Sequence, residues 1–257
     1  MKQVVASIIA TSEVMPEVYL IWLESPQIAS SVHPGQFVMV RCGEECLLRR
    51  PLSIHQRDGN KIALLFSVVG KGTHWLSQRQ DDNKIDLLGS LGNGYLIHPA
   101  SHNLLLVAGG IGIAPLCFLA QDALNKGYSV TLLLGASTGS QLYPAHLLPS
   151  KIKLVTATED GTAGKKGLIT ALLPEYASGA DQIFACGPMP MYRDMALKKQ
   201  ELKGKPVQIS LEVRMGCGLG VCHGCTVKTK SGLKQVCKDG PVFDLDDILW
   251  DELAYDY

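Results

Sequence analysis

Short apolar runs, separated by proline and glycine, fill the first hundred residues. Five of them have the length of a strand, at positions 4–9, 18–23, 36–41, 62–69 and 84–88. Short strands at this spacing are typical of small antiparallel barrels. The pattern therefore predicts an antiparallel β-barrel over residues 1–100.

Residues 101–211 follow a different rhythm, in which apolar strands alternate with helices. The predicted strands are Asn103–Ala108, Val130–Leu134, Lys153–Thr158, Gln182–Ala185 and Val207–Leu211. Helices are expected at 113–126 and 189–203. This alternation indicates an α/β domain with an open, mostly parallel sheet.

The pattern changes again over residues 212–257. Four of the eight cysteines lie between Cys217 and Cys237, and the tail beyond Pro241 is acidic. We expect a small third domain here, so the fold class is multi-domain α+β.

Composition excludes several classes of protein. The 24 basic and 24 acidic residues cancel, so a broadly basic nucleic-acid binder is excluded. The longest stretch free of charged or strongly polar residues, Leu104–Ala120, contains three glycines and falls short of the about 20 apolar residues that a membrane span needs. The N-terminus reads as a strand rather than a signal peptide. We therefore expect a cytoplasmic protein without a membrane partner, whose cysteines serve packing, catalysis or metal binding.

The strongest chemical signal is Cys217-x4-Cys222-x2-Cys225-x11-Cys237. The x4 and x2 spacings match those of plant-type [2Fe–2S] ferredoxins. The alternative is a structural zinc ion held by the same four thiolates, but such zinc sites usually use two Cys-x2-Cys knuckles and only one is present. A Rieske centre needs two histidines, and this segment has only His223.

Two further motifs follow predicted strands of the α/β region. The first contains Gly110-x-Gly112-x-x-Pro115 between a strand and a helix, which is the setting of a dinucleotide-binding turn. Its alternative is a tight turn without a ligand. The second is Cys186-Gly187-Pro188. Ligands bind beyond the carboxyl ends of parallel strands, so Cys186 borders either a nicotinamide ring or only the protein core.

The barrel region carries two candidate anion sites. One is Arg50-Pro51-Leu52-Ser53, in which the arginine can clamp a phosphate and the serine can face a flavin edge. The other is Gly70-Lys71-Gly72-Thr73 before a short helix, with Thr73 expected as its N-cap. Taken singly, each is better explained as a solvated arginine pair or a hairpin turn, and only their joint presence beside a nucleotide-binding fold favours anion sites.

Together, these motifs occur in the order found in the ferredoxin–NADP reductase superfamily. With the cysteine segment added, nearly the whole chain resembles the electron-transfer subunits of type B dihydroorotate dehydrogenases. Two positions depart from the pattern: Leu52, where many members carry Tyr or Phe, and Gly216, where alanine is expected.

The resemblance implies three domains with three cofactors: an FAD-binding barrel (1–100), an NAD-binding α/β domain (101–211) and a [2Fe–2S] domain (212–257). It also implies NAD as the external acceptor and a role in pyrimidine biosynthesis. The partner would be an FMN-containing dihydroorotate dehydrogenase catalytic subunit, in a heterotetramer with two copies of each chain. Alternatives are an NAD(P)H–ferredoxin or sulfide/polysulfide oxidoreductase subunit, and a zinc-bearing nucleotide-sensing module.

The remaining polar residues are predicted to have structural roles or to tune specificity. No Arg or Lys occurs in 135–141, which favours NAD over NADP, although Lys165 and Lys166 follow a later strand. The other cysteines are assigned to packing and the isolated histidines to surface or loop roles: Cys42, Cys46 and Cys117; His33, His98, His102 and His146. Candidate contacts with the partner are Leu219, Val221, Leu249 and Trp250.

Overall fold

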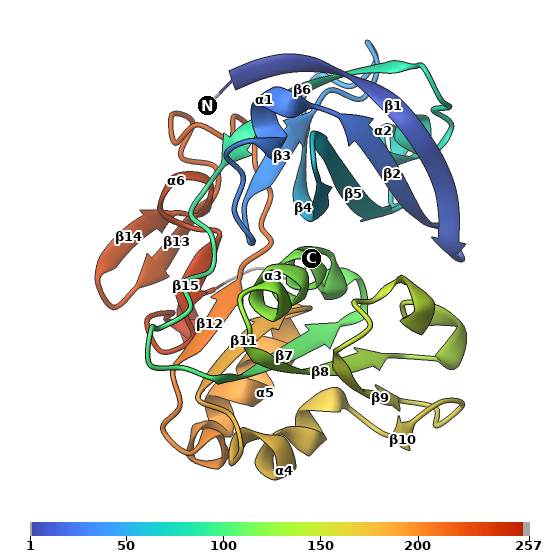
Figure 1. The fold of residues 1–257 in the computed structure, drawn as a ribbon. Helices are drawn as coiled ribbons and strands as arrows, with labels where there is room; N and C mark the ends of the chain where they lie inside the picture. Colours follow the sequence, from blue (N-terminus) through green and yellow to red (C-terminus); the bar gives the residue numbers. More distant parts are fainter. Residues whose placement is uncertain (1, 254–257) are drawn as a thin grey trace.

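The computed structural model describes residues 2–253, and its first six strands close into the predicted antiparallel barrel (Figure 1). The strands run in the order β1-β2-β5-β4-β3-β6 around the barrel. Their bounds are β1 (Lys2–Met15), β2 (Val18–Glu24), β3 (Phe37–Val40), β4 (Arg50–Asp58), β5 (Lys61–Ser67) and β6 (Lys84–Leu91). Two short helices, α1 (Pro26–Ala29) and α2 (Lys71–Ser77), lie between them.

The second part is a seven-stranded sheet in the order β10-β9-β8-β7-β11-β12-β15. All neighbours pair in parallel except β12 and β15, which confirms the predicted parallel sheet. The bounds are β7 (Asn103–Gly109), β8 (Ser129–Ala136), β9 (Lys153–Thr158), β10 (Lys165–Lys166), β11 (Gln182–Cys186), β12 (Val207–Ser210) and β15 (Val242–Asp244).

Helices cover both faces of this sheet. Helix α3 (Ile113–Asn125) packs on one face, and α4 (Leu173–Ala177) and α5 (Met189–Leu197) pack on the other. The helix predicted over 189–203 is shorter in the structure. α5 ends at Leu197, and after Lys198 the chain continues as the 3-10 turn Lys199–Leu202.

Helix α3 is shared between the barrel and the sheet, and it lies between them in Figure 1. Its residues Ile113 and Leu116 pack with the sheet residue Phe184 and with the barrel residue Leu65. Phe118, on the same helix, belongs to the core inside the barrel. Barrel and sheet thus share apolar packing, and the motifs of both halves are held in a fixed relation.

The cysteine segment leaves the sheet after β12 and returns to it as β15. Between them lie β13 (Thr226–Thr229), β14 (Gly232–Gln235) and the turn α6 (Val236–Asp239). Its buried residues join a core that also contains Met39 and Leu91 of the barrel. The segment therefore packs against both larger parts. The predicted 212–257 unit extends beyond the described residues at 254–257.

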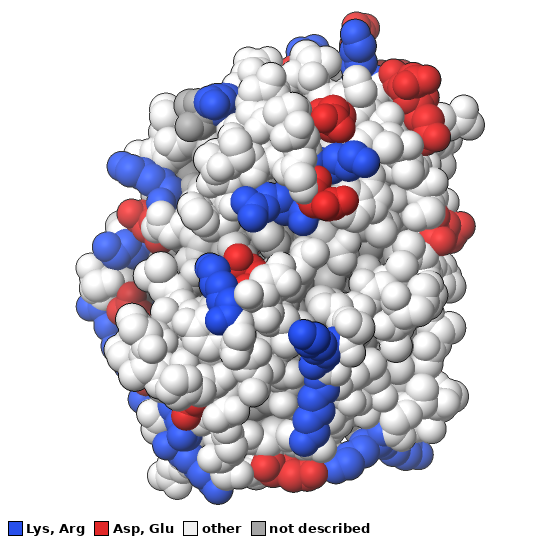
Figure 2. Space-filling view, viewed as in Figure 1, with Lys and Arg blue, Asp and Glu red and all other residues white. Residues whose placement is uncertain are grey.

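On the face shown in Figure 2, lysine and arginine side chains lie among aspartate and glutamate side chains, and a large area on the right carries few charges. Among the described residues, no helix is long and apolar enough to cross a membrane.

Candidate functional site

The four predicted cluster ligands lie close together beside the barrel. Cys217, Cys222 and Cys225 occupy the loop after β12, and Cys237 lies in α6. The Cys237 N–H points at Cys225 Sγ, with 3.4 Å between the two atoms. Cys217 and Cys222 also contact each other. The thiols therefore form two neighbouring pairs, 217 with 222 and 225 with 237.

Backbone N–H groups of the glycine-rich loop point at the sulfurs. The Leu219 N–H donates to Cys217 Sγ at 3.3 Å, and the Gly220 N–H donates to Cys237 Sγ at 3.1 Å. Gly218 makes this turn possible, because its φ is +73° and a Cβ there would lie 2.6 Å from Met39 Cγ. The loop is thus shaped to surround a negatively charged group of sulfurs.

The two pairs differ in electrostatics. Burial alone would raise the pKa of Cys217, but N–H groups of Cys222, Leu219 and Val221 lower it to about 6. Burial raises the pKa of Cys237 to about 12, and the neighbouring Cys225 adds to the rise. A bound cation deprotonates a coordinating thiol outright. Cys237 therefore needs a bound metal to be ionised at neutral pH.

This donor set fits a two-iron cluster better than one zinc ion. A structural zinc ion needs four ligands at about 2.3 Å from a single point. Within residues 2–253, no three His, Cys, Asp or Glu side chains are arranged to hold one metal ion. A [2Fe–2S] cluster instead places two thiolates on each iron, which matches the two thiol pairs.

At the start of β4, the two adjacent arginines have different roles. Arg49 forms two hydrogen bonds with the Asp86 carboxylate, at 2.7 and 3.0 Å, and is bound to the barrel. Arg50, among the described residues, hydrogen-bonds only the carbonyl oxygen of Leu48, at 2.5 Å. Its remaining N–H donors are available for an anion. Pro51, Leu52 and Ser53 follow along β4 and are half-buried.

The second barrel motif meets Arg50 at Gly72. A Cβ on Gly72 would lie 2.9 Å from Arg50 Nε, whereas a Cβ on Gly70 would touch nothing within 4 Å. The missing side chain of Gly72 lets the backbone of the 70–73 loop come close to the guanidinium, and Gly70 leaves open space next to it. Lys71 is exposed at the edge of this space.

The predicted N-cap of α2 is wrong by three residues. The helix begins at Lys71 with Gly70 as N-cap. Thr73 lies one turn inside, where its hydroxyl accepts the Val69 N–H at 2.9 Å and donates to the Gly70 carbonyl at 3.1 Å. Through these two hydrogen bonds, Thr73 holds the backbone of Val69 and Gly70 against the start of the helix.

The dinucleotide motif and the Cys186 motif come together at the carboxyl edge of the sheet. Gly110 has φ +54°, and a Cβ there would meet nothing within 4 Å. A Cβ on Gly112 would lie only 2.0 Å from the Cys186 carbonyl oxygen. Gly112 therefore permits the close approach of the turn 110–112 to the end of β11, and Gly110 faces open space. Pro115 lies in the first turn of α3, as predicted.

Cys186 lies at this edge but is fully buried. Its Sγ lies 3.8 Å from the carbonyl oxygen of Ser210, which also accepts the Tyr192 hydroxyl at 2.6 Å. Burial raises the pKa of Cys186 well above its usual value, so the side chain stays a neutral thiol. A place beside the nicotinamide stays a prediction.

The sequence interpretation missed His55. This side chain lies in β4 two residues beyond Ser53, is fully buried, and forms hydrogen bonds to Ala114 and Tyr143 across the boundary between barrel and sheet. Burial lowers its pKa to about 4. No sequence signal marks it, because a lone histidine in a strand gives no indication of what packs over the strand.

The loops after β8 and β9 form an acidic edge next to the dinucleotide turn. Ser137 Oγ donates to Glu159 at 3.0 Å, and the Gly139 N–H donates to Thr162 Oγ1 at 2.8 Å. Lys165, one of the two lysines considered for a 2′-phosphate, forms an ion pair with Glu175 at 2.8 Å. This edge therefore presents the Glu159 carboxylate, and Lys165 is already paired with a carboxylate.

Among the residues assigned to packing, Cys42 and Cys117 are buried, as predicted. The candidate contact residues divide into two groups. Leu219 and Val221 are exposed. Trp250 is half-buried, packs against Tyr192 and donates its indole N–H to the Leu245 carbonyl at 3.1 Å. Only the first group is open to a partner.

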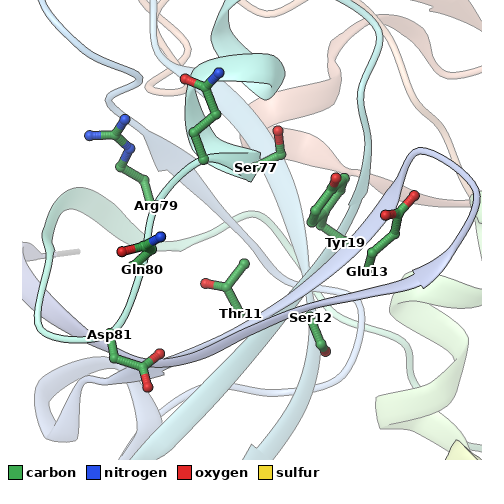
Figure 3. A pocket seen from close by; sticks show the side chains of 9 residues that line it. Thr11, Ser12, Glu13, Tyr19, Ser77, Arg79, Gln80 and Asp81 are labelled. Carbon is green, nitrogen blue, oxygen red and sulfur yellow. The ribbon is translucent and has the colours of Figure 1, made fainter.

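A polar depression of about 500 Å³ lies apart from these motifs. In Figure 3, side chains from β1 and β2 face side chains from the segment at and after the end of α2. None of the predicted site residues lines it. Its lining residues are Thr11, Ser12, Glu13, Tyr19, Ser77, Gln78, Arg79, Gln80 and Asp81.

Comparisons with known proteins agree with this layout. Residues 212–249 match the family model described as the iron–sulfur cluster binding domain of dihydroorotate dehydrogenase B. Residues 106–196 match an oxidoreductase NAD-binding domain.

Among curated relatives, an electron transfer subunit of dihydroorotate dehydrogenase B (NAD(+)) from Desulforamulus reducens is 38% identical over 96% of this chain and 98% of its own. The subunit of the same name from Clostridium acetobutylicum is 41% identical over 82% of this chain and 84% of its own.

Solved structures share the fold. An NADH-dependent reduced ferredoxin–NADP oxidoreductase aligns with a TM-score of 0.87 and 33% identity, over 96% of this chain and 91% of that chain. A ferredoxin–NADP+ reductase from Neisseria gonorrhoeae with bound FAD and NADP aligns with a TM-score of 0.64 and 19% identity, over 79% of this chain and 92% of that chain.

Proposed function

Because the chain belongs to the family of dihydroorotate dehydrogenase B (NAD(+)) electron transfer subunits, we propose that it carries electrons from dihydroorotate oxidation to NAD+ in pyrimidine biosynthesis. Electrons enter from an FMN-containing catalytic subunit and pass through a [2Fe–2S] cluster and FAD. The observation that carries this proposal is the pairing of four thiols, in a segment that matches the family's iron–sulfur domain, beside a flavin-type barrel and a nucleotide-type sheet.

We assign the binding roles residue by residue. Cys217, Cys222, Cys225 and Cys237 hold the cluster, and the loop N–H groups stabilise the charge on its sulfurs. Arg50 binds the FAD pyrophosphate, in the space left by the glycines of the 70–73 motif. Gly110 lets the NAD pyrophosphate approach the backbone.

When bound, FAD supplies the step between one-electron and two-electron chemistry, since a cluster passes single electrons and a nicotinamide takes a hydride. The chain's own contribution is position. The core shared through α3 fixes the barrel relative to the sheet, and burial keeps water from Cys186 and the carboxyl ends of β7 and β11.

A catalytic subunit is implied by the relatives' name, and we propose a heterotetramer of two of each chain. The cluster's exposed side, with Cys222, Leu219 and Val221, supports placing the contact there. We also propose a cytoplasmic location, because the eight cysteines are free thiols and disulfides are rare in that compartment.

Reconstitution tests the assignment. The purified chain should contain iron, acid-labile sulfide and FAD, and should pass electrons from NADH to artificial acceptors. Dihydroorotate-dependent NAD+ reduction should appear only after the FMN-containing catalytic subunit is added. A chain that performs that reaction alone, or a catalytic subunit that neither binds nor confers it, contradicts the proposal. Ferredoxin in place of the catalytic subunit serves as the control for the related oxidoreductases, and stoichiometric zinc without labile sulfide would support the nucleotide-sensing alternative.

A further inference from the structure

His55 connects three segments that are far apart in sequence. From β4 of the barrel, its Nδ1 lies 2.9 Å from the Ala114 carbonyl oxygen, and its Nε2 lies 2.9 Å from the Tyr143 hydroxyl. Ala114 is in the first turn of α3, between Gly112 and Pro115 of the dinucleotide motif. Tyr143 is buried beyond β8, in the segment that follows the acidic edge.

The chemistry of the partners fixes the proton positions. A backbone carbonyl can only accept, so Nδ1 carries the hydrogen and donates to Ala114. In the neutral ring Nε2 then accepts, and the Tyr143 O–H donates to it. Burial lowers the pKa of His55 to about 4, so the ring stays neutral near pH 7. Each ring nitrogen therefore acts only as a donor or only as an acceptor, and the imidazole ring has a single orientation.

Apolar packing alone does not set such an orientation. Phe118 and its neighbours bury α3 against the barrel, but burial of apolar surface is non-directional. Hydrogen bonds require both distance and angle. The Tyr143 ring also packs edge-on against the imidazole, with centroids 5.3 Å apart and planes at 68°. His55 therefore adds direction to a largely apolar interface, in which the Gln56 amide of β4 also donates to Cys117 Sγ of α3 at 3.3 Å.

We propose that His55 and Tyr143 are positioning residues that orient the nucleotide-binding sheet relative to β4, and thereby set the approach of the nicotinamide to the flavin. The inference rests on the proposed function, because it takes the β4 motif as the flavin site and the α3 turn as the nucleotide site. Neither residue touches the reacting atoms. Both act through the backbone segments that they connect.

Two single variants break the same hydrogen bond from opposite sides. Tyr143→Phe keeps the ring and removes the hydroxyl. His55→Asn keeps a donor for Ala114 and loses the reach to Tyr143. We expect the limiting rate of flavin reduction at saturating NADH to fall about tenfold or more in each. The NADH dissociation constant should stay within roughly threefold, since no binding group is removed. Because both variants break one bond, the double variant should be no slower than the slower single one.

Two controls separate this role from general destabilisation. Tyr128→Phe makes the same change at the amino end of β8 and should leave the limiting rate unchanged. Amide hydrogen exchange, measured without substrate, should rise over residues 113–118 in Tyr143→Phe but not in Tyr128→Phe. FAD and iron contents should match the wild type in both. If His55→Asn does not fold, Tyr143→Phe with its control still decides the question.

The outcomes distinguish this inference from the function on which it rests. If NADH does not reduce flavin in the wild-type chain, the proposed function fails. If the wild type is reduced normally and Tyr143→Phe keeps both its limiting rate and its exchange protection, the function stands and the positioning role is wrong.

Discussion

At the scale of single residues, burial decides how His55 responds to acid. Its pKa is about 4 in the folded chain and 6.5 for an ordinary histidine. Between these values the unfolded chain binds a proton that the folded chain does not, so acid favours unfolding. Lowering the pH from about 7.5 to about 5.5 should therefore cost roughly 1.4 kcal/mol of stability through this residue.

Thermal unfolding of the wild type and of His55→Asn at both pH values measures this contribution. The variant lacks the titrating ring, so its midpoint should fall less on acidification than that of the wild type. Equal falls in the two proteins would show that His55 is not held neutral by burial.

The cysteines support a second prediction. Cys222 is exposed at the cluster segment and Cys42 is buried in the barrel core. Cys222→Ala should abolish the cluster's visible absorbance and labile sulfide while FAD stays bound, since the flavin motifs lie on other elements. Cys42→Ala removes one thiol from the core and should keep both cofactors. An intact cluster spectrum in the Cys222 variant would refute the ligand set.

Residue types and spacing predicted more of this site than of the interface around it. Four thiols at x4, x2 and x11 spacing carry their chemistry wherever the chain folds, so their proximity could be expected. Arg50 was chosen over Arg49 from the motif alone, and the pairing of Arg49 with Asp86 could not be predicted, because Asp86 approaches from another strand. His55 was missed for the same reason: its partners lie 59 and 88 positions away.

At the scale of elements, two glycines of the dinucleotide turn should respond differently to the same substitution. Gly112 has an ordinary φ of −59°, but a Cβ there meets the Cys186 carbonyl oxygen at 2.0 Å. Gly112→Ala should therefore lower stability by about 3 kcal/mol, because backbone must move. Gly110→Ala meets no atom and should lose only about 1–2 kcal/mol to its positive φ.

Thermal unfolding of the two variants measures which one loses more stability. If Gly110 faces the pyrophosphate, NADH affinity should fall more in Gly110→Ala than in Gly112→Ala. A Gly112→Ala protein as stable as the wild type would contradict the close approach of the turn 110–112 to the end of β11.

Elements with a strong hydrophobic periodicity were predicted well. Strands that form only by pairing with a distant part of the chain were not. Lys153–Thr158 was predicted at its observed bounds, and α3 ends within one residue of its predicted end. β15 was missed because its three residues become a strand only by pairing with β12. β1 is longer than predicted because its first half pairs with β6 and its second half with β2, although the polar residues Thr11, Ser12 and Glu13 weaken its pattern.

At the scale of the whole molecule, charge at the far edge of the sheet should select the nucleotide. Glu159, bonded to Ser137, repels a 2′-phosphate and can accept a hydrogen bond from a 2′-hydroxyl. We expect kcat/KM for flavin reduction to be at least about tenfold higher with NADH than with NADPH. Glu159→Gln should lower the ratio of kcat/KM with NADH to kcat/KM with NADPH, mainly by raising kcat/KM with NADPH. Comparable rates with both nucleotides in the wild type would overturn this assignment.

The return of the chain from the cysteine segment to the sheet has a consequence for how such proteins arise. Ser210 of β12 pairs with Val242 of β15, so residues 211–241 begin and end at adjacent points. The free energy of closing a loop grows only slowly with its length. A reductase without a metal centre could therefore gain this segment, or lose it, in one genetic event that leaves the strand order intact. Such an exchange must accommodate the apolar contact with Met39 and Leu91, because these barrel residues pack in one core with the cysteine segment.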